Sequence, residues 1–325
     1  MMEEIGILEV GGFAAGQAQD ETAGTGLTVF LFDECAAAGV DIRGGGPASR
    51  ETPLLSPVAD AAGIHALVLS GGSAFGLDAA GGVMRFLEER GIGFDVGVTR
   101  VPLVCQSCLF DLAVGDKAVR PDATMAYRAC GQASRERFDE GCVGAGAGAT
   151  VGKLMGRDCA MKSGIGAYAV QAGGVKVGAV VAVNALGDIY DIDTGAQIAG
   201  LRTEDGRGLR SSEQLLCAQA GQARNPFTDH TNTTIGAVFT NAAFDKAQLT
   251  KIASMAQNGL ARAIRPVHTT ADGDTVYAVS TGAVAGDLNA VGTLAAYVMA
   301  KAIARAAYTA EPMFGLPSAR SLAAI

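Results

Sequence analysis

Short strand-like runs alternate with longer helical patterns along most of this chain, and this alternation limits the folds that it can adopt. We expect strands over residues 26–32, 66–69, 175–183, 234–240 and 275–280. Helices are predicted over residues 76–89, 211–220, 245–263 and 287–308, the last two beginning at an aspartate, which caps helices well. The glycine-rich region 121–164 has few long apolar runs and predicts loops. Together these elements predict a mixed α/β core.

The composition indicates a folded protein with a large core. Hydrophobic residues make up 49% of the 325 positions, which excludes disorder for most of the chain. Glycine occurs 45 times, but without a G-X-Y period and beside only 9 prolines, so neither a collagen-like nor a linker composition fits. Residues 44–47 and 202–210 are candidate linkers, yet neither has the character of a domain boundary. We therefore expect a single domain over residues 1–325.

The charge balance and the N-terminus bear on partners and location. With 25 basic and 33 acidic residues the net charge is −8, which argues against a nucleic-acid or anionic-membrane partner. The acidic start, Met1 to Glu4, differs from the basic n-region of a secretory signal, so a cytoplasmic location is expected. The longest apolar stretch, residues 288–308, is interrupted by Lys301 and Arg305 and predicts a buried helix.

The cysteines and histidines do not form the pattern of a metal or redox centre. Seven scattered cysteines are an odd number, so a disulfide framework is not expected. Cys105 and Cys108 form a C-x-x-C pair in an apolar run without a second pair or a nearby histidine, which favours buried thiols over zinc or redox chemistry. The histidines, His65, His230 and His268, share no metal-like spacing. We therefore predict no metal and no organic cofactor.

The run from Gly144 to Lys153 is similar in composition to a phosphate-binding loop but has the wrong spacing. A P-loop needs a glycine five residues before the Gly-Lys pair and a Ser or Thr after it, and this chain has Ala147 and Leu154 there. A dinucleotide-binding G-x-G-x-x-G pattern fails in the same way. What remains is a glycine-packed segment that delivers one lysine, Lys153.

The segment 69–77 follows a predicted strand and begins a predicted helix. The backbone N–H groups of Gly71 and Gly72 could therefore receive an anion or an oxyanion. A tight strand-to-helix turn explains the same residues equally well. The segment is not a G-x-S-x-G nucleophile elbow, because Ser73 is followed by Ala74 and Phe75.

Thr233 stands where a polar stretch, residues 230–234, runs directly into a predicted strand. A threonine at the start of a strand can attack the preceding carbonyl, and hydrolysis of the resulting ester frees a new N-terminal threonine. That residue then carries a nucleophile and a base together. Its α-amine has a reference pKa of about 7.7 to 8.0, close to working pH, whereas a lysine ammonium at about 10.4 is a poor proton acceptor.

Several motifs in one order carry a resemblance to a known family: RGGGP at 43–47, LSGGSAFGL at 69–77, the glycine tract that ends in Lys153, NTTI at 232–235 and HTTADGDT at 268–275. The chain resembles the self-cleaving D-aminopeptidase and β-peptidyl aminopeptidase family over nearly its whole length. The Asn-Thr-Thr junction and the Asp-Gly-Asp pattern are most similar to the endo-type 6-aminohexanoate (nylon) oligomer hydrolase branch, because the aminopeptidase branch uses a Gly-Ser junction and a Ser-x-Glu pattern.

The resemblance implies roles for individual residues. Thr233 becomes the nucleophile, and Asn232 becomes the residue before the cleaved bond. Lys153 matches a family lysine near the nucleophile's amine, where a cation lowers the pKa of the amine and keeps it a free base. Asn184, at the end of a predicted strand, matches an asparagine whose amide can donate to the oxyanion.

Two further positions follow from the resemblance. Asp272 and Asp274 match an acidic pair that orients the nucleophile and can hold a substrate ammonium. Their i, i+2 spacing places both side chains on one face where the backbone is extended. Phe110 stands where several family members have a tyrosine, so a hydroxyl that could help the oxyanion or the substrate is missing, which affects substrate preference more than cleavage.

The family resemblance implies a layered α-β-β-α sandwich of the self-processing N-terminal-nucleophile type. Processing would give an α chain of residues 1–232 and a β chain of residues 233–325, interleaved in one core. Such αβ units would form a homo-oligomer, a tetramer being one candidate. The expected activity is hydrolysis of small amides or peptides with a free amine. Two alternatives stay open: an acyltransferase similar to ornithine acetyltransferase, and a non-catalytic homologue in which the Asn232–Thr233 bond never breaks.

Overall fold

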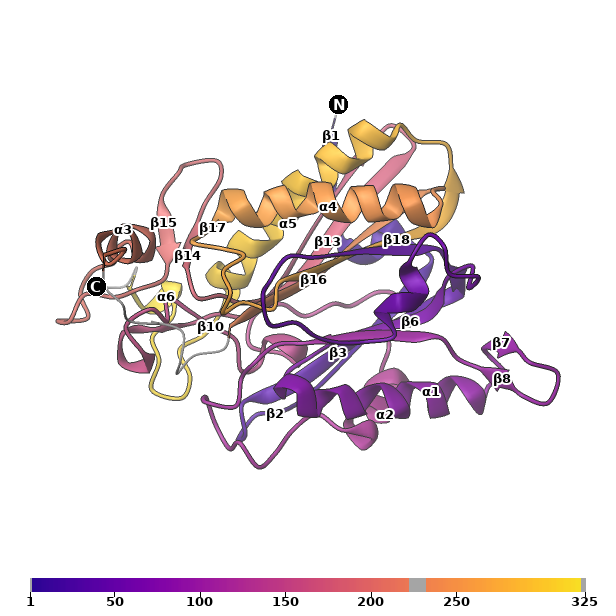
Figure 1. The fold of residues 1–325 in the computed structure, drawn as a ribbon, viewed down its shortest axis with the longest axis horizontal. Helices are drawn as coiled ribbons and strands as arrows, with labels where there is room; N and C mark the ends of the chain where they lie inside the picture. The colour runs from indigo at the N-terminus through magenta and orange to yellow at the C-terminus, as the bar shows by residue number, and fades with distance from the viewer. Residues whose placement is uncertain (1, 222–231, 323–325) are drawn as a thin grey trace.

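The computed structural model, which describes residues 2–221 and 232–322, contains two β-sheets that lie face to face between two pairs of helices (Figure 1). The six-stranded sheet has the order β1 (Met2–Ile5), β12 (Ile165–Ala172), β13 (Val175–Asn184), β16 (Thr233–Ala242), β18 (Thr275–Val284) and β4 (Ala38–Ile42). The five-stranded sheet has the order β2 (Phe13–Asp20), β3 (Thr25–Ala36), β6 (Ile64–Ser70), β9 (Val104–Cys108) and β5 (Ala48–Arg50). The helices α4 (Lys246–Ala263) and α5 (Leu288–Thr309) cover the first sheet, and α1 (Ala80–Glu88) and α2 (Ala123–Gly131) cover the second. This is the predicted α-β-β-α sandwich.

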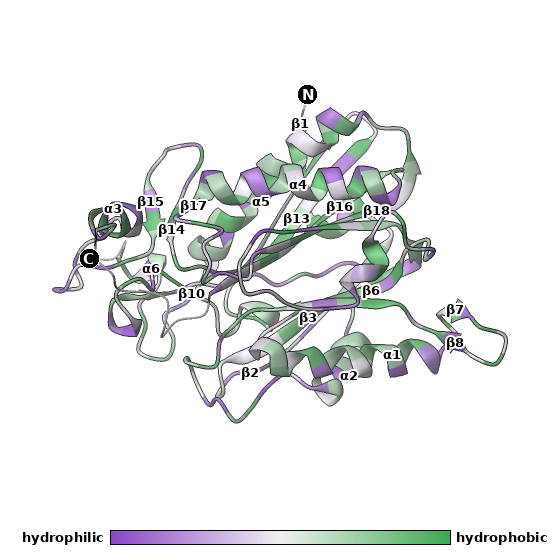
Figure 2. Ribbon diagram, in the orientation of Figure 1, coloured by the Kyte–Doolittle hydropathy of each residue, from purple (hydrophilic) through white to green (hydrophobic). Residues whose placement is uncertain are grey.

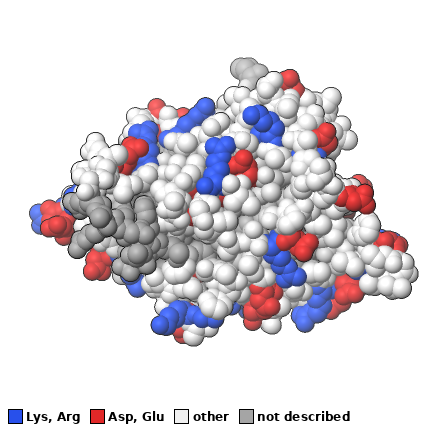
Figure 3. Space-filling view, viewed as in Figure 1, with Lys and Arg blue, Asp and Glu red and all other residues white. Residues whose placement is uncertain are grey.

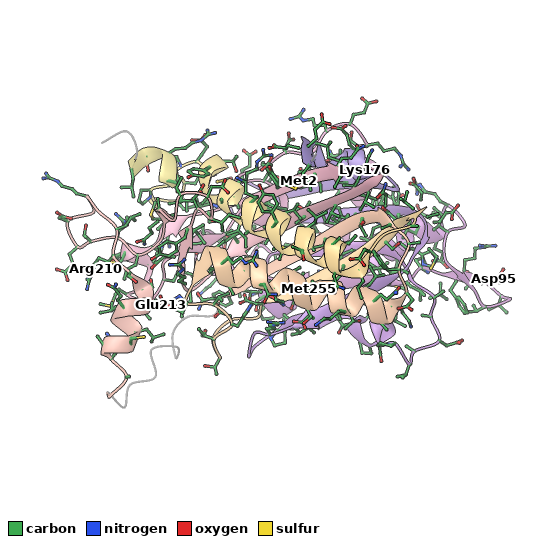
Figure 4. The ribbon with its side chains drawn as sticks, turned by 90° about the horizontal axis from the view of Figure 1, so that it is seen from above. Met2, Asp95, Lys176, Arg210, Glu213 and Met255 are labelled. Atoms are coloured by element: carbon green, nitrogen blue, oxygen red, sulfur yellow. The ribbon has the colours of Figure 1, made fainter. Side chains whose placement is uncertain are left out.

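Smaller elements surround the two sheets. They are the strand pair β10 (Thr150–Val151) and β11 (Met161–Lys162), the hairpin β7 (Phe94–Asp95) and β8 (Arg100–Val101), the three-stranded sheet of β14 (Asp188–Tyr190), β15 (Gln197–Ala199) and β17 (Ile264–Arg265), the short helices α3 (Ser212–Ala218) and α6 (Ala319–Leu322), and five 3-10 turns (Ile7–Val10, Thr52–Leu55, Ser73–Ala79, Gly144–Gly146 and Arg157–Cys159). In Figure 4 the hairpin that carries Asp95 projects at one end of the molecule, and Arg210 and Glu213 lie at the other.

The core consists of three apolar layers, one between the sheets and one under each helix pair. Between the sheets, the ring of Phe239 on β16 lies 4.4 Å from the ring of Phe13 and 4.8 Å from that of Phe30. Figure 2 shows hydrophobic residues along the central strands and more polar ones on loops and outward helix faces. Alternating strand residues therefore serve two layers at once, which explains why β16 is apolar on both faces.

Small residues let α4 and α5 approach each other closely. A Cβ atom at Gly259 would lie only 2.5 Å from the carbonyl oxygen of Ala296. The helices begin where predicted, because the side chains of Asp245 and Asp287 accept hydrogen bonds from the backbone N–H groups three residues later. Among the described residues α5 is long and apolar enough to cross a membrane, yet 67% of its most apolar 18-residue window is buried within the protein.

The structure confirms the predicted strands and corrects two predictions about helices. The first corrected region, 121–164, holds α2 and the pair β10–β11 in addition to loops. The helix α2 is capped by Asp122 and buries the small residues Ala126, Ala129 and Cys130, a face too weakly apolar to show a helical period. The second, 76–89, begins as a 3-10 turn, with the α-helix starting only at Ala80.

The two cysteines of the C-x-x-C pair are buried thiols on β9. Positions three apart on a strand point to opposite faces, so Cys105 and Cys108 do not face each other. Burial raises the pKa of each thiol to about 12, which keeps both protonated at neutral pH. Both are reduced, as are the other five cysteines.

The phenylalanine cluster between the sheets predicts a large cost for one substitution. Phe239→Ala should lower the free energy of unfolding by about 3–5 kcal/mol, because it removes a fully buried ring and leaves a cavity. Denaturant titration of chains with Phe239 and with Ala at this position, both carrying Thr233→Ala, gives the difference in free energy of unfolding for a chain that stays whole.

The matched control is Phe94→Ala, because that ring is 54% exposed on the projecting hairpin. It should change stability by about 0.5 kcal/mol or less. Equal effects of the two substitutions would contradict the packing described for the layer between the sheets.

Candidate active site

The predicted site residues meet at one end of the six-stranded sheet. Thr233 is the first residue of β16 and pairs across the ladder with Asn184, the last residue of β13. On its other side β16 runs parallel to β18, and the loop that leads into β18 carries Asp272 and Asp274. The ends of neighbouring strands thus bring together residues that are far apart in sequence. Thr233 is only 4% exposed there.

The hydroxyl of Thr233 lies against the carbonyl that it is expected to attack. Its Oγ1 donates a hydrogen bond of 2.5 Å to the carbonyl oxygen of Asn232, the preceding residue. Asn232 is itself buried, at 1% exposure. The Thr233 hydroxyl is therefore in contact with the preceding peptide bond and shielded from solvent.

Lys153 reaches the site from the glycine tract. Its Nζ donates to the side-chain Oδ1 of Asn184 at 2.9 Å and to the main-chain oxygen of the same residue at 3.0 Å. Gly152 has a φ of +69°, and a Cβ there would lie 2.0 Å from the backbone of Gly200. The glycine tract therefore ends in a close-packed turn that places Lys153 at the site. Its glycine at position 152 is needed because a side chain would not fit there.

Asn184 is held in a single orientation by its neighbours. Its Oδ1 also accepts from the backbone N–H of Thr150 at 3.1 Å, and its Nδ2 donates to the carbonyl oxygen of Phe110 at 2.7 Å. One hydrogen of the amide group remains for a further acceptor, since an asparagine NH₂ has two. Phe110 contributes its carbonyl to the site, which a tyrosine would contribute equally.

Burial shapes the charges of the site. It lowers the pKa of Lys153 to about 7, and the carboxylates of Asp272, Asp274 and Asp111 act in the opposite direction. Burial, followed by repulsion from Asp274, raises the pKa of Asp272 to about 6, while hydrogen bonds from Thr269 and the charge of Lys153 oppose this rise. Burial therefore shifts the pKa of each group toward neutrality, a property common at active sites.

The two aspartates have different partners. Asp274 Oδ1 accepts from the backbone N–H of Thr234 at 2.7 Å, and its Oδ2 accepts from the backbone N–H of His268 at 3.1 Å and contacts His268 Nδ1 at 3.0 Å. Asp272 Oδ2 accepts from the backbone N–H and the hydroxyl of Thr269 at 2.8 and 2.5 Å. Its Oδ1 accepts no hydrogen bond from any residue that the structure describes.

Sequence reasoning assigned no role to two residues that support the site. One is His268, which has a φ of +58° and contacts Asp274, as described above. The other is Asp111, a buried carboxylate that accepts from Thr25 Oγ1 at 2.6 Å and from the Gly72 N–H at 2.8 Å. A left-handed histidine cannot be read from sequence, but the Phe-Asp pair after a buried strand was a signal for Asp111.

The turn at Gly71 and Gly72 uses its donors internally. The Gly71 N–H donates to the carbonyl of Gly26 at 2.8 Å, and the Gly72 N–H donates to Asp111. A Cβ at Gly71 would lie 1.9 Å from Asp111 Oδ2, so the glycine permits this contact. The geometry is that of the tight turn given as the alternative, and an oxyanion role for either residue would require one of these bonds to open.

No cluster suited to a metal occurs in the described ranges, 2–221 and 232–322, where no three His, Cys, Asp or Glu residues gather around one point. His230 lies outside the described residues. On the face shown in Figure 3, basic and acidic side chains are interspersed over the surface. The expectation of no nucleic-acid partner stays a prediction.

A family profile and two named relatives each match most of this chain. The profile of peptidase family S58 matches residues 6–320. An uncharacterized aminopeptidase of Mycobacterium tuberculosis is 40% identical, covering 97% of each chain. A 6-aminohexanoate-oligomer endohydrolase of Kocuria sp. is 32% identical, covering 91% of this chain and 84% of its own.

Solved structures share the fold. The L-aminopeptidase D-Ala-esterase/amidase of Ochrobactrum anthropi, described as a variant of the Ntn hydrolase fold, has a TM-score of 0.71 at 18% identity, covering 96% of this chain and 88% of its own. A β-aminopeptidase of Burkholderia sp. has a TM-score of 0.67 at 20% identity, covering 98% and 91%.

The burial of Lys153 predicts an unusual titration. In an uncleaved Thr233→Val chain, the ¹³Cε signal of Lys153, identified by its loss in Lys153→Met, should titrate near pH 7, whereas exposed lysines titrate near 10.4. Asp272→Asn should move this pKa further down, because an attractive carboxylate is lost. A Lys153 signal that titrates with the surface lysines would contradict the assignment.

Proposed function

Because this chain belongs to peptidase family S58, we propose that it hydrolyses amide bonds with a threonine nucleophile freed by scission of its own Asn232–Thr233 bond. Hydrolysis of amide bonds is common to the aminopeptidases and oligomer hydrolases among its relatives. The observation that carries the finer proposal is the contact between Thr233 Oγ1 and the carbonyl oxygen of Asn232, in a region that also holds the partly buried Lys153 and two buried aspartates.

In the mature enzyme the Thr233 α-amine would take the proton of the Thr233 hydroxyl as that oxygen attacks the substrate carbonyl. An α-amine has a reference pKa of about 7.7 to 8.0. The charged fraction of Lys153, whose own pKa burial lowers to about 7, would lower the pKa of the amine further and so raise the share of free base at neutral pH. The second amide hydrogen of Asn184 would stabilise the oxyanion of the tetrahedral intermediate. Water then releases the acyl group.

The acidic pair supports a preference for substrates with a cationic amine close to the scissile amide. The two carboxylates differ in their hydrogen bonds. Both oxygens of Asp274 are bonded, to Thr234 and His268, whereas Asp272 uses only Oδ2 among the described contacts. Asp272 is therefore the residue proposed to receive a substrate ammonium, and Asp274 the residue proposed to hold the start of β16. A buried ammonium needs such a partner, because an unpaired charge in the protein interior costs several kcal/mol.

Assembly into a homo-oligomer of αβ units is also proposed, on the family resemblance.

The scission itself is tested by mass. Residues 1–232 and 233–325 share the 32.8 kDa of the chain as fragments of about 23 and 9 kDa. Purified protein held near neutral pH should show both, with threonine at the new N-terminus, and Thr233→Val should remain intact because it lacks the attacking hydroxyl. Thr233→Ser should retain slow cleavage.

The matched control is Thr234→Val, which removes a neighbouring buried hydroxyl that has no hydrogen-bond partner among the described residues. This variant should still divide at the same bond. A wild-type chain that stays whole for days would refute scission.

Substrate preference is tested by acetylation. An aminoacyl p-nitroanilide or a 6-aminohexanoate oligomer with a free amine should have a kcat/KM at least about tenfold above that of its N-acetyl form, because acetylation removes the charge that Asp272 would pair with. The same ratio should approach one in Asp272→Asn, with rates normalised to the processed fraction.

Asp60→Asn, at an exposed position, is the control and should leave the ratio unchanged. Equal hydrolysis of free and acetylated compounds by the wild type would show that the carboxylates serve Thr233 alone.

A further inference from the structure

The peptide bond proposed for scission is paired with a segment of main chain before it is cut. Asn232 and Asp272 form a parallel β-bridge, outside the regular strands. Within it the Asn232 N–H donates to the carbonyl of Ala271 at 2.9 Å, and the Gly273 N–H donates to the carbonyl oxygen of Asn232 at 2.8 Å. The carbonyl to be attacked thus accepts a backbone hydrogen bond in addition to that from the Thr233 hydroxyl.

The residue that donates this bond has to be a glycine. A Cβ at Gly273 would lie 2.8 Å from Thr233 Oγ1 and 2.8 Å from the carbonyl oxygen of Gly46. Real Cβ contacts are never that short, so any side chain would push the loop away from the hydroxyl. The glycine of the Asp-Gly-Asp pattern therefore allows the backbone to reach the reacting atoms.

A second glycine loop holds the donor segment from behind. The Gly46 N–H donates to the carbonyl of Asp272 at 2.8 Å, and the Gly45 N–H donates to that of Thr269 at 3.3 Å. A Cβ at Gly44 would lie 2.2 Å from the backbone nitrogen of Asp274, so this contact too is main chain against main chain. The Gly273 N–H is consequently fixed in place before any reaction begins.

The residue after the scissile bond is fixed by the same segment. Thr234 donates its N–H to Asp274 Oδ1 at 2.7 Å, and Asp274 is in turn held by His268. Residues 271–274 therefore hold the chain on both sides of the bond between Asn232 and Thr233. Such prior placement of a donor removes the cost of reorganisation when charge develops.

We propose that the backbone N–H of Gly273 is the oxyanion donor of the scission reaction, a role that rests on the proposed function. Thr233 Oγ1 forms a bond to the carbonyl carbon of Asn232, and the π pair of the C=O bond moves onto the carbonyl oxygen. The negative charge develops on the oxygen that already accepts a hydrogen bond from the Gly273 N–H. This group touches a reacting atom, so it is catalytic in the processing step.

The remainder of the step balances without another reagent than water. When the oxyanion collapses, the bond from carbon to the Thr233 nitrogen breaks. The nitrogen keeps the electron pair and gains the proton that the hydroxyl lost. This leaves an ester between Asn232 and Thr233 Oγ1 and a free α-amine. Water hydrolyses the ester, giving the Asn232 carboxylate and restoring the threonine hydroxyl.

In the continuous chain, one of the two amide hydrogens of Asn184, the residue expected to serve the oxyanion during turnover, is already engaged. Its Nδ2 donates to the Phe110 carbonyl at 2.7 Å, while its Oδ1 is bonded to Lys153. The carbonyl oxygen of Asn232 instead receives the Gly273 N–H. The processing reaction is thus provided with a donor from the backbone.

The test removes the N–H and changes no side chain. Glycolic acid in place of Gly273, incorporated during translation, converts the amide between residues 272 and 273 into an ester. Loss of a single oxyanion donor should slow scission at Asn232–Thr233 by about 100- to 1000-fold relative to the wild type. The rate is followed by mass spectrometry of freshly made chain, which also separates any hydrolysis of the introduced ester by fragment mass.

The same replacement at Gly46 is the matched control. It deletes a backbone hydrogen bond of equal length to the same loop, but one that does not touch the Asn232 carbonyl. Scission should then slow by less than about tenfold. Equal slowing by the two esters, or a wild-type rate with the ester at 273, would overturn the proposal.

A simpler variant gives a second reading. Gly273→Ala should block scission by displacing the hydroxyl, in a chain whose melting temperature stays close to that of Thr233→Val. Cleavage of Gly273→Ala at the wild-type rate would contradict the requirement for glycine at this position, because alanine keeps the N–H, and the two esters decide whether that N–H is the donor. A wild-type chain that does not divide would instead refute the proposed function, so the two failures are distinguishable.

Discussion

The burial of charge at one end of the six-stranded sheet is the constraint on which the rest of the site depends. Three carboxylates lie close enough to Lys153 to shift its pKa, those of Asp272, Asp274 and Asp111. A charge taken out of water without partners costs several kcal/mol. Each of the four groups is therefore held by hydrogen bonds: the ammonium by Asn184, Asp111 by Thr25 and Gly72, Asp272 by Thr269, and Asp274 by Thr234 and His268. Those bonds in turn fix two strand ends, a turn and a loop. The same arrangement that makes burial tolerable also sets the geometry of the reacting groups.

Main-chain contact is the means by which these segments come close enough. Gly152 lies against the backbone of Gly200 and Gly44 against that of Asp274, while Gly71 lies against the side-chain carboxylate of Asp111, each at a distance that excludes a side chain on the glycine. The glycine tracts that resemble phosphate loops in composition are used here for packing around a site. This use accounts for much of what seems excessive in a chain with 45 glycines, because the approach of two backbones needs glycine at the point of contact.

The sequence predicted most of the fold and named the residues that the structure gathers around Thr233, but it did not predict their different hydrogen-bond partners. Strands and capped helices were identified because their signals are local, whereas α2 was missed because its buried face consists of alanine and cysteine. Asp272 and Asp274 were indistinguishable as an acidic pair, and the structure gives them different partners. His268 was dismissed as a metal ligand, and its contact with Asp274 depends on a left-handed backbone that no local pattern announces.

The sequence by itself determined the alternation of elements, the threonine at the entry to a strand and the order of the motifs around it. These depend on neighbours within a turn or a strand, where propensity and period act directly. Only the tertiary structure decided that Lys153 is desolvated, that Asn184 faces Thr233 across the ladder and that the Gly273 N–H meets the carbonyl of Asn232. The physical reason is that desolvation and hydrogen bonding depend on atoms brought together from segments far apart in the chain, and a sequence read in order carries no distance between them.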